Sequence, residues 1–156
     1  MEGVKVLENR ILDKEEIMKL IPHRGKLLFL DKIVEIQEKS IVAIKTFTAE
    51  ECEGHPFNTV PGLFICEAMA QAGAALVFYH YPHLKKKKFF LYCIRGKDGL
   101  KFSLPVAPGE RITLEVEILK IKMGTCFFRG TASKGFVRVV ELEELIGVLA
   151  DTVQDG

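Results

Sequence analysis

The longest apolar stretch of the chain predicts a buried helix that begins at Pro61 and ends before Pro82. Pro61 suits the first helical position, because its missing N–H would have no helical partner there. Apolar residues then occupy every face of the helix, interrupted only by Glu67, Gln71 and Gly73. A helix that is apolar all round is buried, and these interruptions argue against a membrane span of about 20 strongly apolar residues. We therefore expect the rest of the chain to wrap around this helix.

The residues on either side of this helix show the shorter patterns of strands and turns. Before the helix, the pattern predicts a short helix at 14–20 and strands at 26–38 and 40–48. After the helix, it predicts strands at 89–94, 100–106, 111–118, 125–133 and 136–149. One helix that needs cover on every side, together with one curled antiparallel sheet, gives an α+β architecture. We expect a single domain over residues 1–156.

A sheet of this kind leaves one edge strand and one flank of the helix uncovered. Exposed strand edges and apolar flanks are normally covered by another chain, most often in a two-fold symmetric pair. We therefore expect a homodimer, formed through extension of the sheet. The pattern leaves open whether dimers assemble further into a trimer of dimers.

Composition limits the classes of function. The chain of 156 residues has a formal net charge of +1, which gives no overall field for nucleic acid or a membrane surface. Cys52, Cys66, Cys93 and Cys126 form no CxxC pair, and the N-terminal segment lacks the apolar run of a signal peptide, so we expect a cytoplasmic protein with reduced thiols. Cys52 and His55 resemble half of a metal site, but no second half stands at a matching spacing, and we expect no metal.

Glu67 is the unusual residue of the predicted central helix. Burial in apolar surroundings raises the pKa of a carboxyl group, and Gln71 shares its helix face one turn later. Two interpretations stay open. Glu67 is either a partly hydrated carboxylate paired with a Lys or Arg, or a general acid kept protonated near neutral pH.

A second candidate, His55, stands in the loop that leads to the helix. Histidine has an ordinary pKa that suits proton transfer near neutral pH. Pro61 and Gly62 open the helix, where unpaired backbone N–H groups point outward. A base, an acid and an N–H donor are the groups needed to remove a proton beside a carbonyl and expel a β-hydroxyl. From spacing alone this signal is weak, because a loop histidine is more often an ordinary surface residue.

Three segments of the sequence match the pattern of a known family. GHPFNTVPGLFICEAMAQ resembles the GHFPGxPxxPGxxxxEAMAQ motif of bacterial (R)-3-hydroxyacyl-acyl-carrier-protein dehydratases of the FabZ type. LIPHRGKLLFLDKIVEI is similar to the family segment LLPHRxPFLLVDRVxE, and LYCIRGKDGLKFSLPVAPGERITLEVEILK is similar to LYxxxGIDxxRFxRPVxPGDxxxLEVE. The three matching segments follow one another in the same order as in the family, and the resemblance covers nearly the whole chain. The resemblance implies the hot-dog fold.

The resemblance also implies roles for individual residues. His55 would take the α-proton of a 3-hydroxyacyl thioester, Glu67 would protonate the leaving hydroxyl, and the N–H of Gly62 would hold the thioester carbonyl. Pro61 and Gln71 are the further candidates for substrate binding. In the family, the histidine and glutamate of one site come from different subunits, and the acyl chain lies in a tunnel along the central helix. The implied partner is acyl carrier protein carrying 3-hydroxyacyl chains, with no cofactor.

The sequence also departs from the family pattern. Between the histidine and Pro-Gly the chain has PFNTV, two residues fewer than the family. This shortening leaves two alternatives open: a dehydratase of a specialised pathway such as aryl-polyene synthesis, or a non-catalytic acyl-thioester binder. A hot-dog acyl thioesterase is a further alternative, which would need a water-activating carboxylate. Arg95 and Lys97 replace small and apolar residues, which predicts a changed wall at the substrate entrance.

Two other features have simpler interpretations. We interpret His23, in a Pro-His-Arg segment typical of the family, as structural. The run from Lys85 to Lys88 is interpreted as a solvated loop, with attraction of the acidic acyl carrier protein as the alternative.

Overall fold

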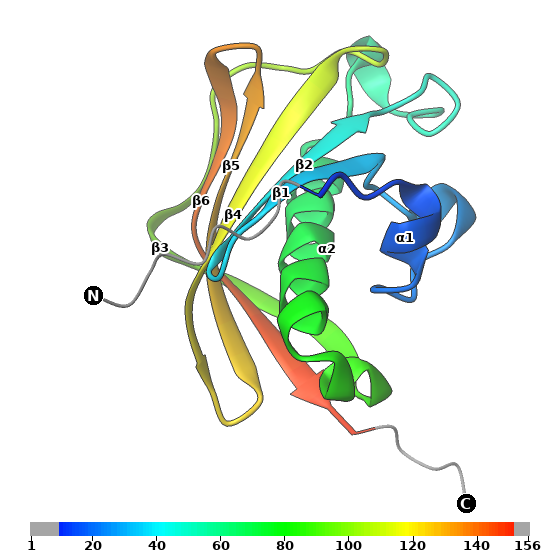
Figure 1. Cartoon of the computed structure of the whole chain (residues 1–156). Helices are drawn as coiled ribbons and strands as arrows, with labels where there is room; N and C mark the ends of the chain where they lie inside the picture. The colour runs from blue at the N-terminus through cyan, green and yellow to red at the C-terminus, as the bar shows by residue number, and fades with distance from the viewer. Residues whose placement is uncertain (1–9, 152–156) are drawn as a thin grey trace, which may run out of the picture.

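The computed structural model describes residues 10–151, and its main elements are one long helix and a six-stranded sheet (Figure 1). The helices are α1 (Lys14–Met18), η1 (Gly25–Leu27), η2 (Pro56–Asn58), α2 (Gly62–His80) and η3 (Pro82–Lys86), where η denotes a 3-10 helix. The strands are β1 (Lys32–Ile36), β2 (Ser40–Thr46), β3 (Lys88–Phe102), β4 (Arg111–Lys122), β5 (Thr125–Lys134) and β6 (Val137–Ala150). Residues 1–9, part of the segment on which the expectation about a signal peptide rests, lie outside the described residues.

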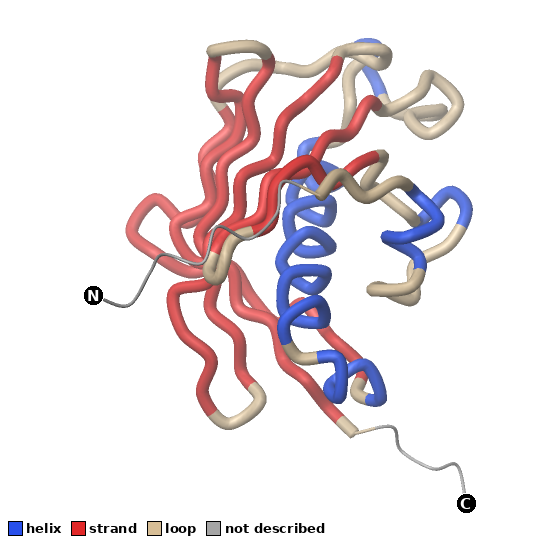
Figure 2. Tube along the Cα trace, in the orientation of Figure 1, coloured by secondary structure: helices blue, strands red, loops and turns tan. Residues whose placement is uncertain are grey.

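The sheet is antiparallel throughout, with strand order β1-β2-β4-β5-β6-β3. It curls around α2 on one side, while α1 and the segment that follows it cover the other side of the helix (Figure 2). The strands β1 and β3 form the two edges of the sheet. The expected α+β architecture, with one helix wrapped by a curled antiparallel sheet, is confirmed.

The central helix α2 is buried along most of its length, from Ile65 to Phe78. Its many alanines and Gly73 allow close packing, because a Cβ on Gly73 would lie only 3.0 Å from the ring of Phe128 in β5. By length and composition the helix is apolar enough to cross a membrane, but 72% of its most apolar window is buried inside the protein. The predicted buried helix is therefore present, with Pro61 as the residue just before its first turn.

The strand predicted at 26–38 is much shorter in the structure. Gly25–Leu27 forms a 3-10 turn, and only Lys32–Ile36 pairs with β2. Between them, Leu28, Phe29 and Leu30 are buried but belong to no strand. The physical reason is that the N–H of Phe29 donates to the side chain of Gln71 on α2 rather than to a neighbouring strand.

The two strands predicted at 89–94 and 100–106 are one long strand, β3, that ends at Phe102. Its pairing with β6 shifts register between Arg95 and Leu100, where Gly96 and Gly99 adopt positive φ angles. The interruption read from the sequence is therefore a bulge within an edge strand. Apolar side chains of this strand remain exposed, including Tyr92, whose exposed fraction is 74%.

Candidate active site

The loop between β2 and α2 positions His55. The backbone N–H of His55 donates to the carbonyl of Cys52, and its Nδ1 lies 2.9 Å from the carbonyl oxygen of Thr59. A carbonyl oxygen only accepts, so Nδ1 carries the proton in the neutral ring and donates it to Thr59. The lone pair of the imidazole is then on Nε2, which has no hydrogen-bond partner among the described residues. This tautomer makes His55 a base whose reactive nitrogen is available to a ligand.

A buried ion pair ties this loop to the sheet. The Nζ of Lys45, in β2, lies 2.8 Å from Oε1 of Glu51, and the lysine side chain is only 2% exposed. The other carboxylate oxygen of Glu51 accepts the N–H of Thr48. Asp31 lies on the far side of the same ammonium at 3.6 Å, and it accepts the N–H of Thr46. The start of the His55 loop is thus held by a charged cluster with little freedom to move.

A cavity of about 460 Å³ opens beside His55 and the beginning of α2. Its walls include Gly62 and Leu63 from the helix and Phe102 from the end of β3. A Cβ on Gly62 would lie 2.4 Å from the ring of Phe102, so glycine is what allows this ring to pack against the start of the helix. The first N–H groups of a helix have no partner within the helix and carry its positive end. The cavity therefore combines a base with donors suited to an oxyanion.

Glu67 lies further along α2, where two side chains contact its Oε1 atom. The Nε2 of Gln71 donates to it over 3.1 Å, and the Nε2 of His23 lies 3.4 Å away. Gln71 is 1% exposed, and its orientation is unambiguous, because its Nε2 also donates to the carbonyl of Leu27 while its Oε1 accepts from Phe29. Glu67 itself is half-buried.

The expectation of a raised pKa for Glu67 is wrong for this chain. Burial acts to raise the pKa of the carboxyl group, but the contacts with His23 and Gln71 outweigh it, and the pKa lies below its ordinary value. The partner of Glu67 is therefore a histidine, and not the Lys or Arg of the simpler interpretation. Sequence reasoning missed this role of His23, because no local pattern relates its segment to the middle of α2.

Within one chain, the two proton-transfer candidates occupy separate surroundings. No hydrogen bond or ion pair joins His55 and Glu67 in the part of the chain that the structure describes. Glu67 is absent from the walls of the cavity beside His55, as are Pro61 and Gln71, whereas Gly62 lines it. Of the five candidate residues, the chain by itself thus brings together His55 with Gly62, and Glu67 with Gln71.

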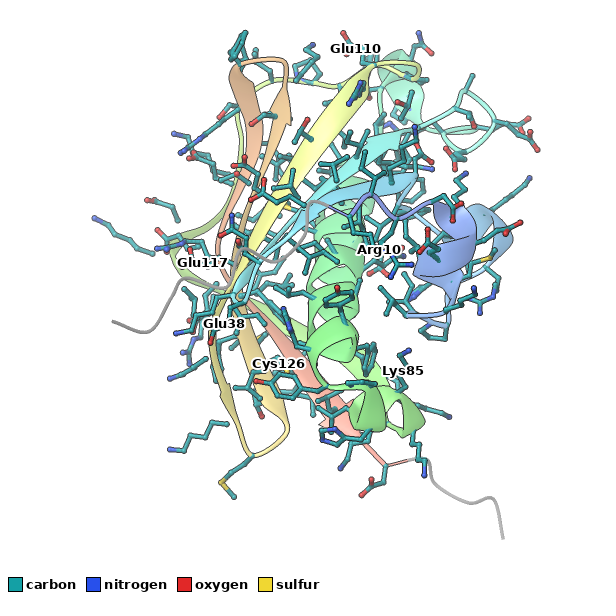
Figure 3. The ribbon with its side chains drawn as sticks, in the orientation of Figure 1. Arg10, Glu38, Lys85, Glu110, Glu117 and Cys126 are labelled. Carbon is teal, nitrogen blue, oxygen red and sulfur yellow. The ribbon has the colours of Figure 1, made fainter. Side chains whose placement is uncertain are left out.

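The remaining charged candidates lie away from this cavity. Arg95 forms an ion pair with Glu144 of β6, over 3.0 Å, and does not line the cavity beside His55. Lys85 lies beyond the C-terminal end of α2, opposite the end that carries Gly62 (Figure 3). A larger cavity of about 760 Å³ has Glu117 and other charged residues in its walls. Glu117 lies on the side of the sheet turned away from α2 (Figure 3).

Comparisons with known proteins show the family to which the chain belongs. The family model of a FabA-like domain matches residues 21–143. The 3-hydroxyacyl-acyl-carrier-protein dehydratase FabZ of Variovorax paradoxus (strain S110) is 40% identical over 129 residues, which cover 80% of this chain and 85% of that protein. The same enzyme of Koribacter versatilis (strain Ellin345) is 39% identical over 130 residues, covering 80% of this chain and 77% of that protein.

The fold also matches that of solved structures. A chain of the dehydratase heterocomplex ApeI:P from Xenorhabdus doucetiae superposes with a TM-score of 0.75, over 87% of this chain and 91% of that one. Its sequence identity of 16% means that this likeness concerns the fold alone.

Proposed function

The chain belongs to the FabA-like domain family, and from this we propose that it is a hydro-lyase of fatty-acid biosynthesis. It removes water from (R)-3-hydroxyacyl chains carried on acyl carrier protein and leaves trans-2-enoyl chains. The observation that supports this best is His55, whose Nε2 has no hydrogen-bond partner among the described residues and whose ring lines a cavity at the start of α2.

The reaction needs a proton removed at C2 and a hydroxyl lost at C3. Nε2 of His55 takes the C2 proton, and the electrons of that bond form the new double bond as the C3–O bond breaks. The thioester oxygen gains negative charge in this step. The N–H of Gly62, at the positive end of α2, stabilises that charge. Glu67 provides the proton that turns the leaving hydroxyl into water, either directly or through a water molecule.

The separation of His55 from Glu67 within one chain supports a site shared between two subunits. In this proposal the protein is a homodimer, and each cavity beside His55 receives Glu67 from the partner. The edge strand β3 exposes Phe90, Leu91 and Tyr92, and the start of α2 exposes Leu63. Exposed apolar groups on an edge strand and on a helix flank are the surfaces that a second copy would cover.

Several further features belong to the same proposal. The substrate partner is acyl carrier protein, and the reaction uses no cofactor, because proton transfer and hydrogen bonding are the only chemistry needed. The proposal includes a cytoplasmic location, the expectation that follows from cysteines without a paired spacing.

Hydration of crotonyl thioester, the reverse reaction, tests the proposal. The purified protein is expected to remove the conjugated absorbance of crotonyl-acyl-carrier protein, and His55→Ala and Glu67→Ala are expected to lose at least about a hundredfold in rate. Release of free thiol instead would identify a thioesterase. Absence of any reaction of the wild-type protein over several chain lengths would favour the non-catalytic acyl-thioester binder.

A further inference from the structure

Among the described residues, the polar group that the side chain of His23 contacts is Glu67. Its Nε2 lies 3.4 Å from Oε1 of Glu67. Its Nδ1 is buried and has no hydrogen-bond partner among the described residues. Buried polar atoms are nearly always paired, so Nδ1 contributes nothing to holding the ring in place. The orientation of this ring is therefore explained by Glu67 and by no other side chain of the described residues.

The backbone on both sides of His23 is anchored, which fixes the position from which its ring reaches Glu67. The guanidinium of Arg24 donates to the carbonyls of Met18, Ile21 and His23, each over 2.7 Å. Further along the same segment, Gln71 binds the carbonyl of Leu27 and the N–H of Phe29. Gln71 also donates to Glu67, so the same amide group fixes both the segment that carries His23 and the carboxylate that His23 contacts.

We propose that His23 is a positioning residue that stores the proton which Glu67 delivers to the leaving hydroxyl. The acid of the reaction is then the His23–Glu67 pair. This inference rests on the proposed dehydration and adds a residue to it.

The proton balance of this step is simple. The proposal places one proton on the pair in the free enzyme, on Nε2 of His23, and leaves Glu67 as the carboxylate that its lowered pKa favours. When the acyl chain enters and excludes water, charge separation becomes less favourable, and the proton moves to Glu67. Glu67 then gives it to the departing hydroxyl, while His55 gains the C2 proton. Solvent afterwards takes the proton from His55 and returns one to the pair.

Few other titratable groups face this pair. On α2, the neighbouring Cys66 is a buried thiol whose pKa is raised to about 11, so it stays protonated. On the segment that carries His23, the guanidinium of Arg24 donates hydrogen bonds to backbone carbonyls, and Lys26 forms an ion pair with Glu50. Among the described residues no further ion pair reaches His23 or Glu67. Within the described residues, the ionisable side chain that contacts Glu67 is therefore His23.

The test is the pH profile of His23→Gln. Glutamine can place a neutral N–H where Nε2 lies, so it keeps a donor toward Glu67 but stores no proton. An imidazole gives up its proton about two pH units above a carboxyl group. The high-pH limb of kcat/KM is therefore expected to move down by about two units. At pH 7.5 the rate is expected to fall about a hundredfold with little change in KM.

His80→Gln is the matched control for Glu67's partner, because His80 ends α2 and its Nε2 lies 2.8 Å from the carbonyl oxygen of Gln37, not beside a carboxylate. This variant is expected to keep the wild-type profile. Circular dichroism and urea unfolding show whether His23→Gln is folded. A folded His23→Gln protein with an unchanged pH profile would overturn the proposal, and so would a loss of rate that is equal at every pH.

An NMR comparison separates this inference from the proposed function. The His23 ring resonances are identified by their loss in His23→Gln, and their chemical shifts are compared in the wild-type protein and in Glu67→Gln. Loss of the carboxylate that contacts the ring is expected to change these chemical shifts. Equal chemical shifts would overturn the pairing of His23 with Glu67. If the wild-type protein hydrates no thioester, the function fails, yet this measurement still decides whether the pair exists.

Discussion

Gln71 holds Glu67 from one turn further along α2, through a hydrogen bond of 3.1 Å from its amide nitrogen to Oε1 of the carboxylate. The amide cannot turn around, because the carbonyl of Leu27 and the N–H of Phe29 bind its two ends in one orientation only. The carboxylate therefore always meets a donor. This arrangement explains how a half-buried carboxyl group on the core helix has a lowered pKa instead of a raised one.

The lowered pKa predicts how Glu67 affects stability at different pH values. The folded-state pKa lies below the ordinary value of 4.5, so ionised Glu67 stabilises the fold above that pH. The contribution is lost as the pH falls through the lower, folded-state pKa. We expect Glu67→Gln to destabilise the protein by less than about 1 kcal/mol at pH 7, because the side chain is partly exposed and solvent screens the contact.

Urea unfolding at pH 7 and pH 3.5 measures this difference. The free energies of unfolding of wild type and Glu67→Gln are expected to converge at the lower pH. A gap between the two proteins that stays the same at both values would show that ionisation of Glu67 plays no part.

Mixing two inactive variants tests whether the site is shared between subunits. His55→Ala and Glu67→Gln are each expected to lose about 10²-fold to 10⁴-fold in rate. After joint unfolding and refolding, half of the dimers contain one chain of each kind, and one of their two sites has both residues intact. The mixture is then expected to recover about a quarter of the wild-type activity. Recovery no greater than that of the separate variants, with mixed dimers demonstrated by mass, would place the acid and base in one chain.

The buried Lys45 is expected to be important for stability. Lys45→Met leaves Glu51 and Asp31 without their shared cation, and loss of one partner of a buried ion pair costs about 3 kcal/mol. Urea unfolding checks this value. Lys26→Met is the control, because Lys26 pairs with Glu50 on the exposed surface, and its loss is expected to change stability by at most about 0.5 kcal/mol. Similar effects of the two variants would contradict the anchoring role of Lys45.

Gly62→Ala tests the packing at the entrance of the cavity. The new Cβ would meet the ring of Phe102 at 2.4 Å, and this half-exposed ring can turn toward the cavity beside His55. We expect little loss of stability, since alanine favours helix, but a rise of roughly tenfold in KM for crotonyl thioester.

The double variant Gly62→Ala/Phe102→Leu provides the control for that clash. A smaller side chain at 102 removes the contact, so KM is expected to return toward its value in the Phe102→Leu single variant. A double variant as impaired as Gly62→Ala would show that the ring is not the cause.

Local pattern was enough to predict most of the fold. The strict alternation of apolar and polar residues at 111–118 identified β4, because one face of that strand is buried. The all-apolar run after Pro61 identified α2, because that helix is buried on every side. The end of β4 was missed by four residues, at Lys122 instead of 118. That extension depends on pairing with Thr125–Lys134 across a hairpin, which the residues of β4 alone do not show.

Other features could not be predicted from the local sequence. Leu28, Phe29 and Leu30 have the same apolar pattern whether they pair in a sheet or pack on a helix. The side chain of Gln71, distant in sequence, decides between the two.

The sequence by itself determined that α2 is buried and which motif contains His55, Gly62 and Glu67, because hydrophobic period and motif spacing are properties of neighbouring residues. Only the tertiary structure decided that Glu67 is held as a carboxylate, that His23 is its neighbour, and that His55 lies elsewhere in the same chain. The reason is that a pKa depends on the few atoms within about 4 to 6 Å of the group. Folding brings those atoms together from segments that are unrelated in sequence.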